Sequence, residues 1–426
     1  MMPVATTTTD STRASSWRGG RPWRAQRGAI LVQAAIMLVG LTAFSAFVVD
    51  YGILWTARRQ IQNAADAAAL AAAISLGFDA PGDQARARAN ALTAVAQNRV
   101  WGAAAAVQAG DITFPACPVG SVGPGGGVCV RVDAFRNAGD SLLPTVFAHL
   151  VGVSSQGVKA TATAQVLYGA SSDCVKPFAI PDRWDELRAN VGLAGWDPLD
   201  TFERYLPGGG ILPGTTDVYV PPTPGPSGPN GTGFSRGPTS YTMSDYGQQL
   251  HFAAGDTPRG NRKAGNEEFL PLHVSPGSTG PADYLQDIVT CSARVVSQND
   301  DILVEPGVVD AETASGVDTL INQDAAATWN PSMNGGLGGV AGGCMASGGC
   351  TVSPRIVVLP VYDPGIWDQA RPTADFVLVS RVVGFFIERY EAPYIVGRLM
   401  VAPAAPRSSM NADPISAFVV SVALVR

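Results

Sequence analysis

Residues 29–49 read AILVQAAIMLVGLTAFSAFVV and contain no charged side chain. A helix of this length rises about 31 Å, which matches the roughly 30 Å hydrocarbon core of a bilayer. The N-terminal flank carries one acid, Asp10, and the arginines Arg13, Arg18, Arg21, Arg24 and Arg27. The length of this apolar segment predicts a single transmembrane helix. Because basic residues collect on the cytoplasmic side, the arginines place its N-terminal end in the cytoplasm. Residues 1–28 are then a cytoplasmic basic leader, and the bulk of the chain lies outside.

Two other interpretations of this segment remain open. A cleaved signal peptide also has a basic start and an apolar run, and Ala43-Phe44-Ser45 could serve as its cleavage site. The apolar run of a signal peptide is usually only 7–15 residues long, however. A buried core helix is the second alternative, and the arginine-rich leader argues against it.

The helical pattern continues beyond the apolar segment. Small and apolar residues recur at spacings of three and four through DYGILWTARRQIQNAADAAALAAAISL, residues 50–76. Eight of the ten positions from Ala64 to Ala73 are alanine, which favours a helix and allows close backbone approach. Gly77 and Pro81 predict its end. Either this helix packs under its own domain, or it also packs against copies of itself.

These residues resemble the N-terminal region of TadE/TadG-like Flp pilus-assembly proteins. The resemblance rests on Arg27-Gly28, Asp50-Tyr51-Gly52, Arg58-Arg59-Gln60 and residues 62–70, and extends to residues 143–147 and 158–164. It implies a non-enzymatic, minor-pilin-like or accessory component of the tight-adherence (Tad) system that serves surface adhesion. The inner membrane, other Flp pilus-assembly proteins and a second copy of the N-terminal helix are the partners that it implies.

Prepilin-type processing is a further implication of the resemblance. Pilin-like members are cut after a glycine and carry a glutamate at the fifth position of the mature chain. The matching residues here are Gly28, Ala29 and, at the fifth position, Gln33. Gln33 can hydrogen-bond a neighbouring terminal amine but cannot neutralise it in a medium of low dielectric. This departure favours an accessory protein that stays in the membrane.

The remaining sequence predicts an α+β protein. Residues 50–168 form a pilin-like region whose long helix carries a small α/β head, with a second helix at 83–98 and strands at 128–132 and 159–166. Residues 169–426 form an extracytoplasmic, loop-rich β domain with Gly/Pro-rich loops at 207–238 and 334–350. Strands are expected at 355–362, 375–390, 394–401 and 418–426, and helices at 282–291 and 313–327.

Six cysteines fit an oxidising compartment, and no CxxC spacing supports a zinc site or a thioredoxin-like site. Fifteen connectivities exist for six cysteines. The connectivity with the shortest loops pairs Cys117 with Cys129, Cys344 with Cys350, and Cys174 with Cys291.

Enzymatic and nucleic-acid functions find little support. A net charge of −6 argues against a nucleic-acid partner. Ser235 lies in a GxSxG pattern, but Gly and Pro surround it where a nucleophile elbow needs a strand and a helix. Asp300, Asp301, Glu305, Asp310, Glu312, Asp318 and Asp324 crowd one region without EF-hand spacing. We therefore expect no catalytic residue, cofactor or metal. The alternative is an exported, membrane-tethered protein whose C-terminal domain binds a ligand or hydrolyses a substrate.

Overall fold

The structure is a computed structural model of the 426-residue chain. The residues that it describes are 26–79, 83–117, 128–136, 142–168, 171–188, 201–206, 209–220, 223–224, 234–235, 241, 245–254, 267–275, 277, 280–291, 294–305, 309–370, 376–403 and 418–425. Residues 1–25 of the predicted leader lie outside this set. The described chain divides into two compact units, Met1–Thr56 with Leu143–Gln156, and Ala57–Leu142 with Gly157–Arg426.

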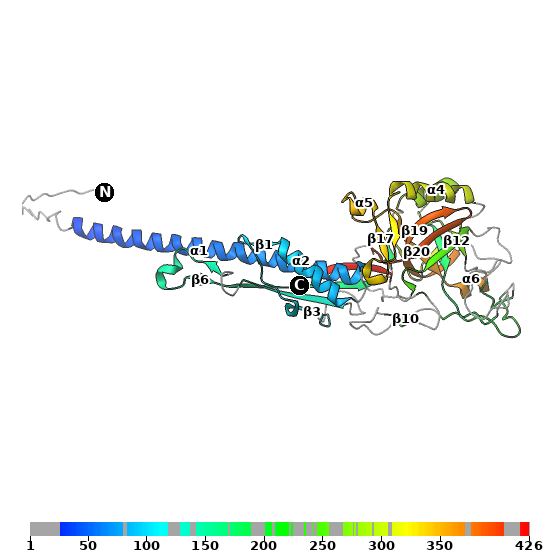
Figure 1. Cartoon of the computed structure of the whole chain (residues 1–426), viewed down its shortest axis with the longest axis horizontal. Coiled ribbons are helices and arrows are strands. Elements are labelled where there is room, and N and C mark those ends of the chain that lie inside the picture. Colours follow the sequence, from blue (N-terminus) through cyan, green and yellow to red (C-terminus); the bar gives the residue numbers. More distant parts are fainter. Residues whose placement is uncertain are drawn as a thin grey trace, which may run out of the picture. The chain divides into compact units, whose positions relative to one another are not determined.

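The helix α1, Gln26–Ile74, is continuous through the predicted span and the alanine-rich stretch (Figure 1). It passes into a π-helical turn, Ser75–Asp79, close to the predicted end. In the first unit, α1 is accompanied by a small hairpin. The hairpin consists of β5, Leu143–Pro144, the 3₁₀ turn η4, Ala148–Val151, and β6, Ser155–Gln156.

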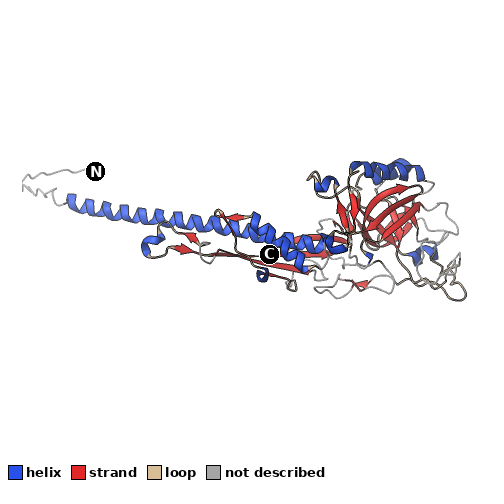
Figure 2. Cartoon of the chain, viewed as in Figure 1, coloured by secondary structure: helices blue, strands red, loops and turns tan. Residues whose placement is uncertain are grey.

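In the second unit, the rest of α1 lies along a five-stranded sheet (Figure 2). The strand order is β21-β22-β7-β4-β3, with antiparallel pairing from β22 to β3. The bounds are β3 Ile112–Thr113, β4 Val128–Arg136, β7 Val158–Tyr168, β21 Ala402–Pro403 and β22 Val419–Val425. The helix α2, Gln84–Gln97, follows α1, and the Asp83 carboxylate caps it by accepting from the N–H groups of Ala85 and Arg86.

The C-terminal strand changes the expected division of the chain. The head was expected to end near Tyr168, but β22 pairs with β7 along its length, from Val420 opposite Tyr168 to Val425 opposite Thr163. Residues 168 and 169 therefore do not separate two independent sheets. Strand pairing between distant segments carries no local sequence signature, so the apolar pattern of residues 418–426 predicted the strand and not its neighbour.

The second sheet closes on itself. Its order is β15-β19-β18-β9-β13-β12-β20, and the extra pairing of β19 with β20 makes a six-stranded barrel with β15 alongside (Figure 1). The pairs β18–β9 and β12–β13 are parallel. The bounds are β9 Phe178–Pro181, β12 Gln249–Ala254, β13 Glu268–Pro271, β15 Asp301–Leu303, β18 Ile356–Tyr362, β19 Phe376–Glu391 and β20 Tyr394–Leu399.

Apolar burial inside this sheet stabilises the second unit. Val358, Tyr362, Val379 and Val382 belong to one buried cluster with Trp184. The helix α4, Asp310–Gln323, packs against β19 and against α3, Pro281–Val289. The expected helix at 313–327 therefore starts and ends a few residues earlier. Together with the long apolar helix, these elements confirm the α+β class.

The Gly-rich stretch 334–350 is more ordered than the predicted loop. It contains a 3₁₀ turn, Asn334–Gly336, the strand β17, Gly339–Ala341, and a short helix α5, Gly343–Ala346. β17 pairs with β16, Thr328–Asn330. Gly338 has φ +91°, and a Cβ there would collide with the Trp329 ring, so glycine is required for this turn.

The remaining elements are short. They are β1 Arg99–Val100, β2 Ala103–Ala104, the 3₁₀ turn Ala109–Asp111, β8 Ser171–Ser172, β10 Thr223–Pro224, β11 Phe234–Ser235, β14 Val296–Ser297 and α6 Pro364–Ala370. Part of the expected loop 207–238 lies outside the described residues. The structure forms disulfides Cys117–Cys129, Cys174–Cys291 and Cys344–Cys350, with Cα–Cα distances of 5.2, 4.6 and 5.2 Å.

Candidate functional site

The first half of α1 exposes its apolar side chains around the whole helix. Exposed members include Ile30, Leu31, Val32, Ile36, Met37, Leu38, Val39, Leu41, Phe44, Phe47, Val48 and Val49. Among the described residues, α1 is the one helix long and apolar enough to cross a membrane. A water-soluble helix turns a single apolar stripe toward its core, so apolar exposure on every side indicates a helix that meets lipid or protein.

The predicted processing residues lie at the start of this helix. Gly28 is exposed in the first turn of α1, and no other atom approaches within 4 Å of the position of a Cβ on it. Ala29 follows in the helix, and the Gln33 side chain is exposed one turn later. The three residues therefore lie in the first turns of α1, and processing at Gly28 stays a prediction.

Asp50 joins the helix to the hairpin at residues 143–156. Its carboxylate accepts the backbone N–H groups of Val146 at 2.7 Å, Phe147 at 3.0 Å and Ala148 at 2.6 Å. The side chain is 7% exposed. At the start of η4 these three N–H groups have no backbone acceptor, so they are free to bind the Asp50 carboxylate. Because the acceptor is ionised, the hydrogen bonds are charge-assisted and hold the hairpin to the helix.

Three other backbone N–H groups of the hairpin donate within it. The N–H of Val153 donates to the Ala148 carbonyl at 3.0 Å, and the N–H of Gly152 donates to the His149 carbonyl at 3.1 Å. The N–H of Thr145 donates to the Ser154 carbonyl at 3.3 Å, and its hydroxyl donates to the Val153 carbonyl. Gly152 closes the turn with φ +88°. The result is a compact loop whose polar backbone is directed inward or at Asp50.

The second half of α1 is buried in its own unit. Ala64, Ala65, Ala68, Ala69, Ala72 and Ala73 are all 0% exposed. On the neighbouring face, the Gln62 amide donates to the Asp66 carboxylate at 2.8 Å and to the Thr161 carbonyl of β7 at 3.2 Å. These residues line a cavity of about 250 Å³ with Thr163, Leu424 and Val425. The alanine stretch therefore packs within the chain, as the first of the two interpretations of this helix expects.

The barrel contains a buried ion pair. Arg381 and Asp182 are both 0% exposed and contact each other through a guanidinium–carboxylate hydrogen bond. Arg381 also donates to the Tyr241 carbonyl at 2.7 Å, and the Tyr219 hydroxyl donates to Asp182 at 2.9 Å. Burying two charges is tolerable only when they are paired and hydrogen-bonded, as here. Because both charged side chains are fully buried, this cluster supports the barrel.

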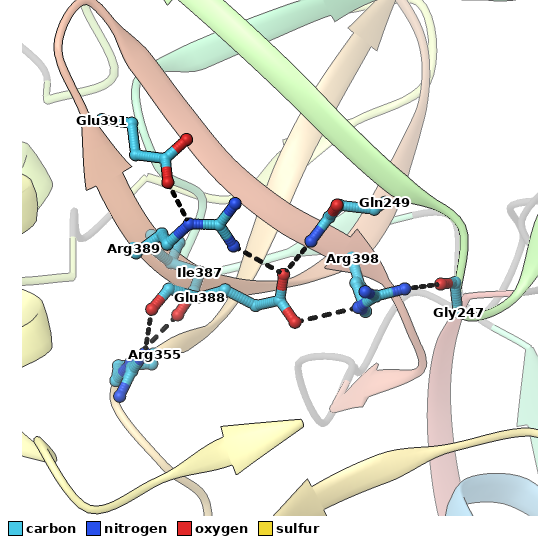
Figure 3. A network of polar contacts seen from close by, with 8 residues as sticks. All are labelled: Gly247, Gln249, Arg355, Ile387, Glu388, Arg389, Glu391 and Arg398. Atoms are coloured by element: carbon cyan, nitrogen blue, oxygen red, sulfur yellow. Dashed lines mark hydrogen bonds and ion pairs between the residues drawn. The ribbon is translucent and has the colours of Figure 1, made fainter. Parts of the chain in front are cut away.

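A second polar network lies where β12, β19 and β20 meet (Figure 3). Glu388 accepts from Arg398 at 2.9 Å and from the Gln249 amide, and Arg389 lies 3.6 Å from it. Arg389 donates in turn to Glu391 at 2.6 Å. Arg355 is held by the backbone carbonyls of residues 387 and 388. Each carboxylate has a cationic neighbour, so the network ties three strands together.

Among the described residues, the acids considered for a calcium site are dispersed over several elements. Ser235 ends the two-residue strand β11, and the rest of its GxSxG pattern lies outside the described residues. The acids disperse: Asp300 accepts the Ser297 N–H, Asp310, Glu312 and Asp318 lie on α4, and Asp324 binds Ser353 and the Cys344 N–H. Within the described ranges, no group of three or more His, Cys, Asp or Glu side chains is arranged to hold a metal ion.

Glu305, another acid of that group, has a buried ionisable partner. It contacts the His273 imidazole, and the two side chains are 1% and 8% exposed. Burial raises the pKa of Glu305, although the His273 charge and the Gly280 N–H act in the opposite direction.

Sequence reasoning missed the role of Asp50. The signal was present: Asp50 is the one charged residue between Gly28 and Ala57, and a charge surrounded by apolar residues needs partners. The partners lie 96–98 positions further along, in a second stretch, 141–158, that lacks Asp, Glu, Lys and Arg. Both stretches include residues that carried the resemblance, Asp50-Tyr51-Gly52 and residues 143–147.

In the comparison with known proteins, the matching segment coincides with the helix α1. No curated protein and no solved structure matches the chain. A family model that describes Flp pilus-assembly TadE/G-like proteins matches residues 28–75. The match covers α1 from its first turn to its end and confirms the predicted family for this segment. Over residues 28–75, the chain is therefore similar to TadE/G-like proteins of Flp pilus assembly.

Proposed function

We propose that this protein is a non-enzymatic, single-pass membrane component of Flp-type (Tad) pilus assembly, acting as a minor-pilin-like or accessory scaffold. The observation that carries the proposal is the division of α1. Its first half exposes apolar side chains on every side, and its second half is buried in the second unit. The same helix thus has one half suited to a lipid environment and one half packed in a folded unit.

Physical chemistry supports the membrane assignment. A run of exposed Leu, Ile, Val, Phe and Met side chains would drive aggregation in water, and each buried CH₂ gains about 0.8 kcal/mol in an apolar medium. An α-helix also satisfies its own backbone, as a membrane span requires. The exposure of these side chains argues against the alternative of a buried core helix. A cleaved signal peptide would remove half of the element that matches the family.

The orientation follows from charge and redox chemistry. Five arginines precede the span, so residues 1–28 are assigned to the cytoplasm and the second unit to the periplasm or cell surface. The three disulfides of the second unit suit that oxidising side of the inner membrane.

Retention in the membrane is part of the proposal. Gln33 replaces the glutamate of pilin-like proteins, and an exposed glutamine cannot compensate a neighbour's terminal amine as a carboxylate does. N-terminal sequencing of the mature protein decides the processing. An intact leader supports a permanent accessory role, and a start at Ala29 shows that Gly28 is cleaved. A start near Ala46 contradicts the anchor.

The function is tested with two matched strains. Deletion of residues 29–49 is expected to release the protein from membranes and to abolish pilus formation and surface attachment. Replacement of residues 30–49 by an unrelated 20-residue apolar span is expected to restore both, because an accessory scaffold needs the anchor and not its sequence. Normal pili in the deletion strain would overturn the proposal. Failure of the replacement alone would show that α1 makes specific contacts in the membrane, as a pilin does.

A further inference from the structure

Two separate stretches of sequence that contribute to the first unit are almost free of charge. Residues 28–57 and 141–158 contain a single Asp, Glu, Lys or Arg, which is Asp50. The structure brings these stretches together, and the hairpin covers that one carboxylate with three N–H groups. The hairpin therefore covers the one carboxylate of these stretches, and the one titratable side chain of the hairpin itself is the exposed His149.

The backbone of the hairpin is equally suited to an environment poor in water. The N–H groups of residues 145–148, 152 and 153 all have acceptors within the first unit. Unsatisfied backbone groups cost several kcal/mol in lipid, so irregular chain enters a membrane boundary only when its polar groups are satisfied in this way.

The hairpin lies at a defined height along the helix. From Ile30 to Asp50, α1 rises about 30 Å, which is the thickness of the hydrocarbon core. With Ile30 at the inner boundary, Asp50 and the residues bound to it are level with the outer boundary. The first exposed charges beyond them are Arg58 and Arg59, about two turns further along the helix.

Exposed aromatic and apolar side chains occupy the same level. Phe47, Tyr51 and Trp55 stack along one side of α1, with ring centroids 6.0 and 6.4 Å apart. They are 66%, 56% and 52% exposed, and on the hairpin Val146 is 54% exposed. Aromatic rings at this position are typical of the belt that marks a membrane–water interface.

We propose that residues 143–156 rest in the outer headgroup layer of the bilayer as a second membrane contact beside the span. The inference rests on the proposed membrane span and goes beyond it. We assign the phospholipid surface as the partner of the hairpin. The reason is that the apolar first half of α1 continues, without an exposed acidic or basic side chain, into the aromatic residues beside the hairpin. Contact at two elements would restrain the tilt and rotation of α1, which a single helix leaves to its anchors.

The experiment uses the full chain with one added cysteine, labelled with the fluorophore NBD. The six native cysteines are all paired in the structure, so the added thiol is the one available for labelling. The variants are Val146→Cys and Val153→Cys on the hairpin, Val39→Cys in the span, and Leu303→Cys on the barrel. Leu303 is a matched control because its 52% exposure resembles that of Val146. The probes are phosphatidylethanolamine–phosphatidylglycerol vesicles with nitroxide lipids, and aqueous iodide.

Nitroxide lipids are expected to quench NBD at residues 39, 146 and 153, and iodide quenching at 146 and 153 should be weaker than at 303 by a factor of about two or more. If residue 39 is quenched by lipid but 146 and 153 match 303, the hairpin does not touch the membrane and the inference falls while the anchor stands. If residue 39 also behaves like 303, the membrane span itself is wrong. Protection of 146 and 153 in cells but not in vesicles would assign the surface to a protein partner and overturn the lipid assignment.

Discussion

The carboxylate of Asp50 accepts the backbone N–H of Ala148 at 2.6 Å across 98 positions of sequence. Through this contact and those to Val146 and Phe147, one side chain of the helix holds the hairpin in place. Removal of the carboxylate should therefore free the hairpin without unfolding the helix, whose backbone bonds are local.

Asp50→Ala should raise the amide hydrogen exchange rates of residues 146–148 by about tenfold or more, since three donors lose a charged acceptor. Asp50→Asn keeps one acceptor oxygen and should give a smaller increase. Asp133→Ala, which removes an acid whose partners lie on β4 and β7, serves as the control and should leave the exchange of these residues unchanged. Unchanged exchange in Asp50→Ala would show that the hairpin is held by other contacts.

The alanine face of α1 predicts a stability effect within one chain. Ala68 is 0% exposed, so Ala68→Leu inserts three carbons into a closely packed contact and should destabilise the second unit by about 1–3 kcal/mol. Asn63→Leu adds a similar side chain on the exposed side of the same helix and should cost far less. Thermal unfolding of both variants in detergent measures the difference. Equal melting temperatures would indicate that the alanine face is not packed in the monomer.

Lys176 predicts a pH dependence of stability. Burial lowers the pKa of Lys176 to about 8, although Asp287 acts to raise it, and its ammonium donates to the Thr290 carbonyl at 2.7 Å. In the unfolded chain, the pKa returns toward 10.5. Between these values, the unfolded state binds the additional proton, so the free energy of unfolding should rise with pH, by roughly 3 kcal/mol over the whole window.

Urea unfolding of the full chain in detergent between pH 7.5 and 9.5 measures this slope. Burial raises the pKa of Tyr241 and Tyr284, so these residues favour unfolding only above about pH 10 and do not interfere. Lys176→Met should remove the slope, and Lys159→Met, at a lysine whose side chain is 51% exposed, should retain it. A slope that survives Lys176→Met would assign the effect to another group.

The buried pair in the barrel predicts a large cost for losing one partner. Arg381→Met leaves the Asp182 carboxylate buried without its cation and should destabilise the barrel by about 3–5 kcal/mol. The exposed pair Arg389–Glu391 provides the comparison, because Arg389→Met should cost at most about 1 kcal/mol. Chemical unfolding of the two variants separates the effects. Similar small losses in both would mean that Asp182 reaches water when Arg381 is removed.

Local patterns predicted most individual elements. Uninterrupted apolar character gave α1, Asp83 gave the start of α2, and Val-, Ile- and Phe-rich runs between Pro and Gly gave β18, β19, β20 and β22. The strands β9 and β13 were missed. Each has only four residues and ends in a proline, Pro181 in β9 and Pro271 in β13, so neither shows enough apolar alternation to be recognised.

Long-range pairing could not be predicted from these patterns. Barrel closure by β19 and β20, the parallel pairs and the return of β22 to β7 all depend on which strands meet, and apolar alternation specifies a face but not a neighbour. The same limit applies to the candidate site. Composition placed Asp50 beside a membrane span, but its three donors come from a segment far away in the sequence.

The central claim is that α1 carries the chain once across the inner membrane. The leader then lies in the cytoplasm, and the strands β21 and β22 near the C-terminus lie on the other side. Alkaline phosphatase fused after Arg426 tests it directly, because this enzyme becomes active only on the oxidising side, and carbonate extraction of the same strain tests integration. The account predicts an active fusion that stays in the carbonate-washed membrane pellet. An inactive fusion, or an intact fusion that washes into the supernatant, would contradict it.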